Sequence, residues 1–426
     1  MKKAIKKIAL LLIVFGIGVG VTLIYTNNKY KVYEEEKPKQ IKKHVDTISM
    51  MLETEANSGN YEMTTSSSWP TDGYVFNTEL SKCENGGELS WDNTTKQVLM
   101  SGNVSDKCYV YFDMMPPILL ADYVKSLYTG TQGENSIYYH DASLTNGAGD
   151  NSYRYAGASS AVNNFVCFGT NTTPCPTDNL YRIIGVFGDQ VKLIKYDYAT
   201  SALLGTEGDY YGTETPNASY YKGSLTTIDT YYWNSSTQKN TWSESLLNKT
   251  NLNANFIANI GSGWAKKIAT TTWKVGGNTN EKISYVIPSI AYQNEINNPA
   301  PGSYSTTGEI NYEAQIGLMY VSDYGYAASP SAWSKTLNSY NGNDDNGAAI
   351  KTINWLYFGS YEWTISRNAD DTYYAFSVFS TGNVYYSYVD YDVVRYSNGV
   401  RPSFYLLSSI TYVSGDGTQN SPIIIN

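Results

Sequence analysis

The chain has 426 residues, enough for about two or three domains. Charged residues make up only 16%, whereas 41 tyrosines and 35 glycines are present, a composition typical of strand-rich extracellular proteins with many tight turns. A net charge of −9 excludes a dedicated nucleic-acid-binding protein, because such proteins need a basic surface to contact phosphates, and the aromatic content of 14% excludes general disorder.

The N-terminus contains an uninterrupted apolar run. Residues 8–25, "IALLLIVFGIGVGVTLIY", are just long enough to cross a bilayer and follow four lysines between Lys2 and Lys7, which would remain in the cytoplasm. A cleaved signal peptide is the alternative, but polar residues 27–29 follow directly in place of a small-residue cleavage site. We therefore expect a transmembrane helix within residues 1–26 and a single-pass protein of the cell membrane with an extracellular C-terminal domain.

The next segment, residues 27–60, is highly charged near its start. Val45, Ile48, Met51 and Leu52 have the spacing of one face of an amphipathic helix. We interpret this segment as a helical stalk.

Residues 61–115 change to short alternating segments separated by turn residues. In "KCYVYFD", Tyr109 and Tyr111 alternate with Val110 and Phe112, as in a strand with two dissimilar faces. The pattern predicts a small β-sandwich-like module. The proline pair at residues 116–117 ends it.

Four cysteines are present. Cys83 and Cys108 lie 25 positions apart, and Cys167 and Cys175 lie 8 apart. An even, sparse set favours disulfides outside the cytoplasm, and of the three pairings, sequence proximity favours Cys83–Cys108 and Cys167–Cys175. A metal site is the weaker alternative, because no C-x-x-C pair or histidine cluster accompanies them.

Residues 116–426 are expected to form one large domain. Residues 180–198 predict a hairpin around Gly188 and Asp189. Residues 241–260 predict a helix with Thr241 or Ser243 as its N-cap, and strand-like segments follow Gln315. Helices followed by strands indicate an α+β fold.

Several segments of this region are familiar as a set. They are "LYRIIGVFGDQVKLIKYDYA" (180–199), "IGLMYVSDYGYAASPSAW" (316–333), "NWLYFGSYEWTISRN" (354–368), "AFSVFSTGNV" (375–384), "GVRPSFYL" (399–406) and "SGDGTQNSP" (414–422). Together they resemble gut-bacterial surface proteins with a C-terminal C-type-lectin-like domain of the kind diversified by diversity-generating retroelements. The resemblance covers roughly residues 180–426.

The resemblance implies a rigid lectin-like scaffold that displays a variable region, here residues 376–402, for binding changing ligands. The implied framework positions are Phe376, Val378, Ser380, Gly382, Val384, Val389 and Gly399 to Pro402. The implied variable, ligand-binding positions are Ser377, Phe379, Asn383, Tyr385, Tyr386, Ser387, Tyr388, Asp390, Tyr391, Asp392, Arg395 and Tyr396.

The chemistry of these residues also suits recognition. Tyrosine offers a large rigid amphipathic surface with two torsions to freeze, and Ser and Asn add adaptable hydrogen bonds, as in antibody paratopes. Val384, Val389 and Val393 would face the core, and Arg401 would pair with an Asp or a carbonyl group. The alternative interpretation is that tyrosine-rich strands are simply a good β surface.

Other chemistry is weakly indicated. His140 next to Asp141 lacks a nucleophile motif, so we expect an ordinary surface histidine. The oxygen-rich "NGNDDNG", residues 341–347, would accept Ca²⁺ but lacks the twelve-position loop with its terminal Glu, so we interpret it as a polar turn and expect no cofactor.

We therefore expect a membrane-anchored adhesion or ligand-binding protein without enzymatic activity. Its partner would be a protein or glycan on another cell, a phage or a host surface, and not a nucleic acid. Two alternatives stay open: a structural envelope or pilin-like component, in which the tyrosine-rich face packs against another copy, and a carbohydrate-active enzyme.

Overall fold

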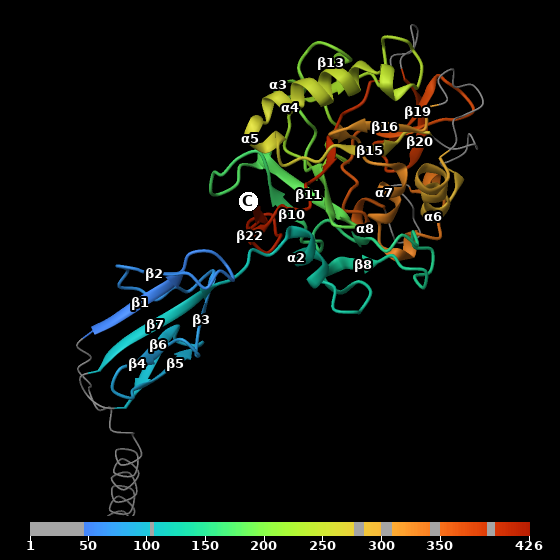
Figure 1. Cartoon of the computed structure of the whole chain (residues 1–426). Helices are drawn as coiled ribbons and strands as arrows, with labels where there is room; N and C mark the ends of the chain where they lie inside the picture. The colour runs from blue at the N-terminus through green and yellow to red at the C-terminus, as the bar shows by residue number, and fades with distance from the viewer. Residues whose placement is uncertain (1–46, 103–105, 277–284, 300–308, 341–349, 390–396) are drawn as a thin grey trace, which may run out of the picture. The chain divides into compact units, whose positions relative to one another are not determined.

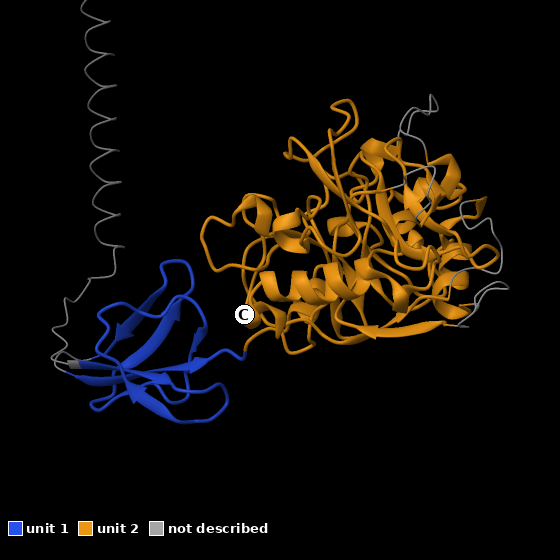
Figure 2. Ribbon diagram, turned by 90° about the horizontal axis from the view of Figure 1, so that it is seen from above, with its two compact units in different colours: residues 1–116 blue, residues 117–426 orange. Residues whose placement is uncertain are grey.

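The computed structural model describes residues 47–102, 106–276, 285–299, 309–340, 350–389 and 397–426. The chain divides into two compact units, unit 1 (Met1–Pro116) and unit 2 (Pro117–Asn426), coloured blue and orange in Figure 2.

In the described residues of unit 1, the regular secondary structure consists of β-strands. They are β1 (Thr47–Glu53), β2 (Tyr61–Met63), β3 (Tyr74–Phe76), β4 (Lys82–Cys83), β5 (Glu88–Asp92), β6 (Gln97–Ser101) and β7 (Lys107–Met114). One sheet has the order β2-β1-β7-β3, with β4 also paired to β7, and β5 and β6 form a separate hairpin (Figure 1). Val110 and Phe112 of β7 are buried between these layers, where Phe112 contacts Trp91 of β5 with ring centroids 5.4 Å apart. The alternation predicted for β7 is confirmed.

The predicted helical stalk is wrong from Thr47 onward. Residues Thr47–Glu53 form β1, which pairs in parallel with β7, and Met50 packs into the core of unit 1. The spacing of Ile48, Met51 and Leu52 is compatible with a helix, but backbone pairing with β7 provides more contacts than an isolated short helix would gain. Tertiary pairing therefore overrides the local periodicity.

The predicted membrane anchor also requires correction. The expected transmembrane helix, residues 8–25, lies outside the described residues, and within the described ranges no helix has the length and apolar character needed to span a bilayer. Within the described ranges, where the fold is rich in strands, the expected fold class with a transmembrane helix and the expected single-pass membrane location are therefore contradicted.

Unit 2 is built around a seven-stranded sheet of order β17-β21-β12-β11-β9-β8, with β10 paired to β11. These strands are β8 (Ile137–Tyr139), β9 (Tyr153–Tyr155), β10 (Phe165–Cys167), β11 (Leu180–Phe187), β12 (Gln190–Lys195), β17 (Ile316–Gly317) and β21 (Ser403–Tyr405). The predicted hairpin is confirmed, since β11 and β12 pair across Gly188 and Asp189. Gly188 has a φ of 61°, a left-handed conformation that glycine adopts without strain.

Smaller sheets complete unit 2. They are β13 (Tyr210–Glu214) with β14 (Ile228–Tyr231), β15 (Thr271–Lys274) with β16 (Asn311–Ala314), β18 (Glu362–Arg367) with β19 (Tyr374–Val378) and β20 (Val384–Tyr388), and β22 (Tyr412–Ser414) with β23 (Ile424–Ile425). Thus β12 near the start of the unit pairs with β21 near its end, which closes the domain through non-local contacts.

The helical segments of unit 2 are short. The α-helices are α2 (Leu120–Ser126), α3 (Ser201–Leu204), α4 (Ile257–Asn259), α5 (Ser262–Ala265), α6 (Pro288–Tyr292), α7 (Val321–Tyr326) and α8 (Ile350–Ile353). The π-helices are η4 (Leu247–Phe256) and η6 (Gln293–Asn297), and the 3₁₀ turns are η1 (Glu134–Ser136), η2 (Thr177–Asn179), η3 (Trp242–Glu244), η7 (Pro330–Ala332) and η8 (Leu337–Ser339). Segments α3 to α5 gather on one side of the unit and α6 and α7 on another (Figure 1).

The predicted α+β order, with helices first and strands later, is therefore wrong. Strands β8 to β12 lie between α2 and α3 in the chain, ahead of the remaining α-helices, and the segment 241–260, expected as one helix, contains η3, η4 and α4. Thr241 precedes η3, but its side chain makes no capping hydrogen bond. Frequent Asn, Gly, Ser and Thr residues favour turns over long helices, so the sheet carries the fold.

Candidate functional site

Strands β18, β19 and β20 form a three-stranded sheet that carries most of the described predicted binding positions. Their central pairing is antiparallel, with Phe376 opposite Tyr386 and Tyr374 opposite Tyr388. The connecting turn closes with a hydrogen bond from the Phe379 amide to the Asn383 carbonyl at 2.9 Å. Gly382 has a φ of 97°, so this turn requires glycine.

Apolar residues fix this sheet to the core. Phe376, Val378, Val384 and Val389 are all buried and belong to the main hydrophobic core of unit 2. The inward orientation predicted for Val384 and Val389 is confirmed, and Val393 lies outside the described residues.

A cavity of about 700 Å³ opens beside this sheet. We call it the tyrosine pocket, and its lining residues are Glu214, Tyr361, Tyr374, Phe379, Tyr385, Tyr386, Ser387, Tyr388, Ser397 and Asn398. The volume lies within the usual range of small-ligand sites, about 300 to 1,000 Å³. The structure thus brings Phe379, Tyr385, Tyr386, Ser387 and Tyr388, five predicted binding positions, to one cavity.

The aromatic rings of the tyrosine pocket contact one another in a continuous series. The ring-centroid distances are 5.0 Å for Tyr361–Phe379, 6.0 Å for Phe379–Tyr385, 4.4 Å for Tyr385–Tyr386, 4.8 Å for Tyr374–Tyr386 and 4.4 Å for Tyr374–Tyr388. Ring pairs at these separations support each other, which limits the side-chain freedom that a ligand would otherwise have to freeze.

The Tyr374 hydroxyl is a neutral hydrogen-bonding group. Burial and the hydrogen bond with Tyr388 raise the pKa of Tyr374 above its ordinary value. A protonated tyrosine hydroxyl both donates and accepts hydrogen bonds.

Glu214 and Asn398 line the pocket from outside this sheet. Glu214, the last residue of β13, accepts a hydrogen bond from the Ser360 hydroxyl at 2.6 Å, and burial raises the pKa of its carboxyl group. Asn398 is 2% exposed, and its side-chain nitrogen Nδ2 has no hydrogen-bond partner among the described residues. No Lys or Arg of the described residues lines the pocket, whereas Glu214 does, so anionic ligands are disfavoured.

Two other predicted binding positions do not line the tyrosine pocket. Ser377 is fully buried, and its hydroxyl lies 2.8 Å from that of Ser387. The Asn383 side chain stays within the turn and accepts a hydrogen bond from the Thr381 hydroxyl at 2.5 Å. The remaining predicted positions, Asp390, Tyr391, Asp392, Arg395 and Tyr396, lie outside the described residues.

Sequence reasoning missed Glu214, Tyr361, Tyr374, Ser397 and Asn398 as lining residues. Tyr374 begins the strand that pairs with β20, so extending the strand pattern backward by two residues from Phe376 would have found it. Glu214 is far away in the chain, and no local pattern marks it.

Arg401 fixes the end of the predicted variable region. It is 2% exposed, and its guanidinium donates two hydrogen bonds to the Glu362 carboxylate, both at 2.8 Å, and one to the Leu356 carbonyl at 2.6 Å. The predicted carbonyl partner is confirmed, and the carboxylate belongs to a Glu, not an Asp.

His140 is not the surface residue that we expected. It is fully buried, and its Nδ1 accepts a hydrogen bond from the Ala148 amide at 3.1 Å. Burial lowers the pKa of His140 well below its ordinary value. The histidine is therefore a neutral core residue that packs against Tyr326 and Trp333.

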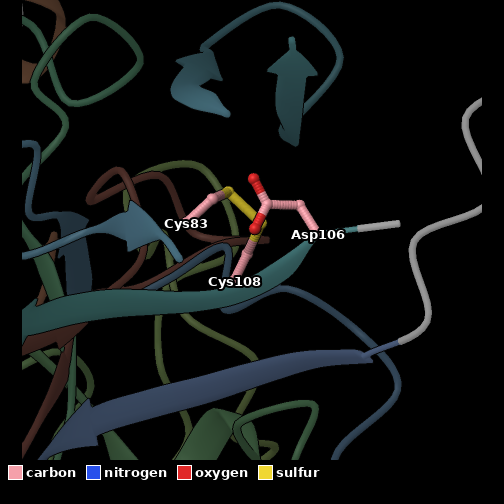
Figure 3. Close-up of side chains that lie close together, drawn as sticks. All are labelled: Cys83, Asp106 and Cys108. Carbon is pink, nitrogen blue, oxygen red and sulfur yellow. A yellow bond between two sulfur atoms is a disulfide. The ribbon is translucent and has the colours of Figure 1, made fainter. Parts of the chain in front are cut away.

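One cysteine group has the proximity of metal ligands. Cys83, Asp106 and Cys108 of unit 1 lie together in Figure 3. The two sulfurs are bonded as a disulfide, and the Asp106 carboxylate accepts hydrogen bonds from the Asn85 and Gly87 amides at 2.7 and 2.9 Å. Because both sulfurs are bonded to each other, only the Asp106 carboxylate could act as a metal ligand, and the group has a structural role. Both predicted disulfides, Cys83–Cys108 and Cys167–Cys175, are confirmed.

The oxygen-rich segment 341–347, considered for Ca²⁺, lies outside the described residues. Comparison with known proteins adds no assignment, since no protein-family model, no curated protein and no solved structure matches the chain.

Proposed function

We propose that the protein is a non-enzymatic ligand-binding or adhesion protein that recognises a protein or glycan through the tyrosine pocket. The observation that carries the proposal is the coincidence of a 700 Å³ cavity with five positions predicted as binding residues from sequence. We further propose that residues 376–402 are a diversified region on a C-type-lectin-like scaffold.

The arrangement of fixed and exposed side chains supports this function. Phe376, Val378 and Val384 are buried, while Tyr385, Tyr386 and Tyr388 on β20 remain partly exposed in the pocket. Tyr385 and Tyr388 can therefore change with limited effect on the core. Tyrosine-rich binding surfaces combine large contact area with a low entropic cost of ordering.

The polar groups that line the pocket restrict the chemical class of the ligand. The Glu214 carboxylate would repel an anion, whereas the hydroxyls of a neutral glycan or of polar protein side chains can donate to Glu214 and accept from Asn398. We therefore expect neutral or cationic ligand groups in this pocket.

The test is a binding screen of the full chain against immobilised neutral glycans, acidic glycans and proteins, with a Tyr386→Ala variant. Tyr386 contacts both Tyr374 and Tyr385, so its loss should weaken binding by about tenfold or more. The matched control is Tyr373→Ala, because Tyr373 is 48% exposed and does not line the pocket. Its binding should stay within about twofold of wild type.

Two results would contradict the proposal. One is a ligand whose affinity is unchanged by both Tyr386→Ala and Tyr386→Phe. The other is a protein that binds nothing in the screen and polymerises in sedimentation experiments, which would favour the structural envelope or pilin-like alternative.

A further inference from the structure

A second, smaller cavity of about 240 Å³ lies elsewhere in unit 2 and shares no lining residue with the tyrosine pocket. We call it the lysine pocket. The residues that matter for its chemistry are Asp178, Tyr181, Lys195 and Thr200, and the other lining residues include four from the neighbouring helical segments. Liquid water occupies about 30 Å³ per molecule, so the cavity suits a small ion or metabolite and excludes a polymer.

Lys195, the last residue of β12, is a buried cation without a carboxylate partner. It is 2% exposed, and its ammonium group donates one hydrogen bond, to the Asp178 carbonyl at 3.0 Å. No carboxylate of the described residues lies within ion-pair distance of it, whereas the equally buried Lys192 contacts the Asp323 carboxylate at 2.6 Å. An ammonium group has three donors, and two donors of Lys195 form no hydrogen bond with the described residues, although the ammonium lies 5.9 Å from the centroid of the Tyr181 ring.

A second buried basic residue lies on the neighbouring strand, outside the lysine pocket. Arg182 of β11 is buried and donates to Asn164, Ser159 and the Val162 carbonyl at 2.5, 2.8 and 2.7 Å, all neutral acceptors. Burial lowers the pKa of Arg182 to about 9 and also lowers the pKa of Lys195. Tyr181, not Arg182, lies opposite Lys195 in the strand register, so Arg182 lies on the other face of the sheet, and burial disfavours the charged form of both groups.

Nearby acids compensate only partly. The negative charges of Asp178 and Asp197 raise the pKa of Lys195, but neither carboxylate forms an ion pair with it among the described residues. The Asp197 carboxylate is already occupied by the Tyr198 amide at 2.7 Å, the Tyr221 hydroxyl at 2.6 Å and the Ser224 amide at 3.1 Å. Burying a cation without a counter-charge costs several kcal/mol, so a group that supplies the missing charge would be bound favourably.

Two hydroxyl groups complete the site. Tyr181 and Thr200 both line the lysine pocket, and within the described part of the chain neither side-chain hydroxyl forms a hydrogen bond. Both can donate to an anion that also contacts Lys195.

We propose that the lysine pocket binds a small anion, a carboxylate or an inorganic oxyanion, through the Lys195 ammonium group and the Tyr181 and Thr200 hydroxyls. The site does not depend on the function proposed for the tyrosine pocket.

The experiment titrates the full chain with sodium acetate, inorganic phosphate and sodium sulfate, each against NaCl of equal ionic strength, by calorimetry and by thermal unfolding. We expect saturable binding of at least one anion, with a melting temperature that rises with its concentration. Acetate binding would identify a carboxylate site, and phosphate or sulfate binding would identify an oxyanion site.

Lys195→Met removes the charge but keeps the side-chain length. We expect it to weaken anion binding by about tenfold or more and to leave the anion-free protein folded, because it also removes an unpaired buried charge. Tyr181→Phe and Thr200→Val provide milder variants that keep the fold and should each weaken binding severalfold. Lys266→Met, at an exposed lysine outside the pocket, is the control and should bind like wild type.

Either of two outcomes would overturn the proposal. One is the absence of saturable binding of all three anions to the wild-type chain. The other is binding that survives unchanged in Lys195→Met, Tyr181→Phe and Thr200→Val, which would place the anion elsewhere.

Discussion

Replacing Arg401 by Met should destabilise unit 2 strongly. The change removes a two-point ion pair with Glu362 and a hydrogen bond to the Leu356 carbonyl, and it leaves the Glu362 carboxylate buried without its cation. Glu362 is 2% exposed, so water cannot replace the lost partner without opening the structure. Breaking a buried pair in this way costs about 3 to 5 kcal/mol.

The thermal effect follows from the size of the unit. Unit 2 extends from Pro117 to Asn426. At about 2 cal/mol/K per residue, the unfolding entropy of roughly 300 residues is about 0.6 kcal/mol/K. The expected loss therefore corresponds to a decrease in melting temperature of about 5 to 8 °C, measured by differential scanning calorimetry.

The loss should also depend on pH. Burial raises the pKa of Glu362 even with Arg401 present, and without the guanidinium this pKa rises further. A carboxyl group whose pKa is raised in the folded state is protonated there at low pH and destabilises the fold as pH increases through that pKa. The difference between Arg401→Met and wild type should therefore be smaller at pH 5 than at pH 8.

A double variant and an exposed ion pair provide the controls. Arg401→Met with Glu362→Gln removes the orphaned charge and should recover about 2 kcal/mol relative to Arg401→Met alone. Lys125→Met breaks the exposed Lys125–Asp189 pair, with its nitrogen and oxygen 3.3 Å apart, and should cost less than about 1 kcal/mol. If Arg401→Met and Lys125→Met lower the melting temperature equally, the argument from the buried pair is wrong.

Two further predictions concern the interior of unit 2. Gly399→Ala would place a Cβ 2.6 Å from a ring carbon of Tyr198 and should lower the free energy of unfolding by about 1 to 3 kcal/mol, measured by calorimetry. Gly263→Ala is the control and should be neutral or slightly stabilising, because no atom lies within 4 Å of the new carbon. Equal effects of the two substitutions would contradict this prediction. Burial raises the pKa of Glu295 from 4.5 to about 7 in the folded protein. Ionisation of Glu295 should therefore lower the free energy of unfolding by about 3 kcal/mol as the pH rises from 4.5 to 7, measured by urea titration at each pH. If Glu295→Gln leaves the slope of unfolding free energy against pH unchanged, the assignment to Glu295 is wrong.

Local patterns predicted the parts of the fold that local sequence controls. The alternation of Val110 and Phe112 with two tyrosines determines β7, and Gly188 with Asp189 determines the turn between β11 and β12. Thr47–Glu53 shows the limit, because its periodicity fits a helix and only its pairing with β7 makes it a strand. The pairing of segments that are far apart in the chain cannot be predicted from the residues of one local window.

The same limit applies to the tyrosine pocket. Tyr385, Tyr386 and Tyr388 lie on one strand, and their composition predicted a binding surface before any geometry was known. Glu214 enters the pocket from β13, and Ser360 orients its carboxylate from another segment. The charge preference of the pocket therefore arises from tertiary contacts that no local motif encodes.

The contacts of Arg401 explain how a changing surface can coexist with one fold. Gly399 pairs with the start of β18 through the Trp363 amide at 3.2 Å and the Tyr361 carbonyl at 2.9 Å, and Arg401 binds Glu362 two residues later. The last framework residues of the predicted variable region are therefore anchored to β18, while Tyr361, directly before that strand, lines the tyrosine pocket. Substitutions at Tyr385, Tyr386 or Tyr388 leave these anchoring bonds in place, so they should alter binding far more than stability.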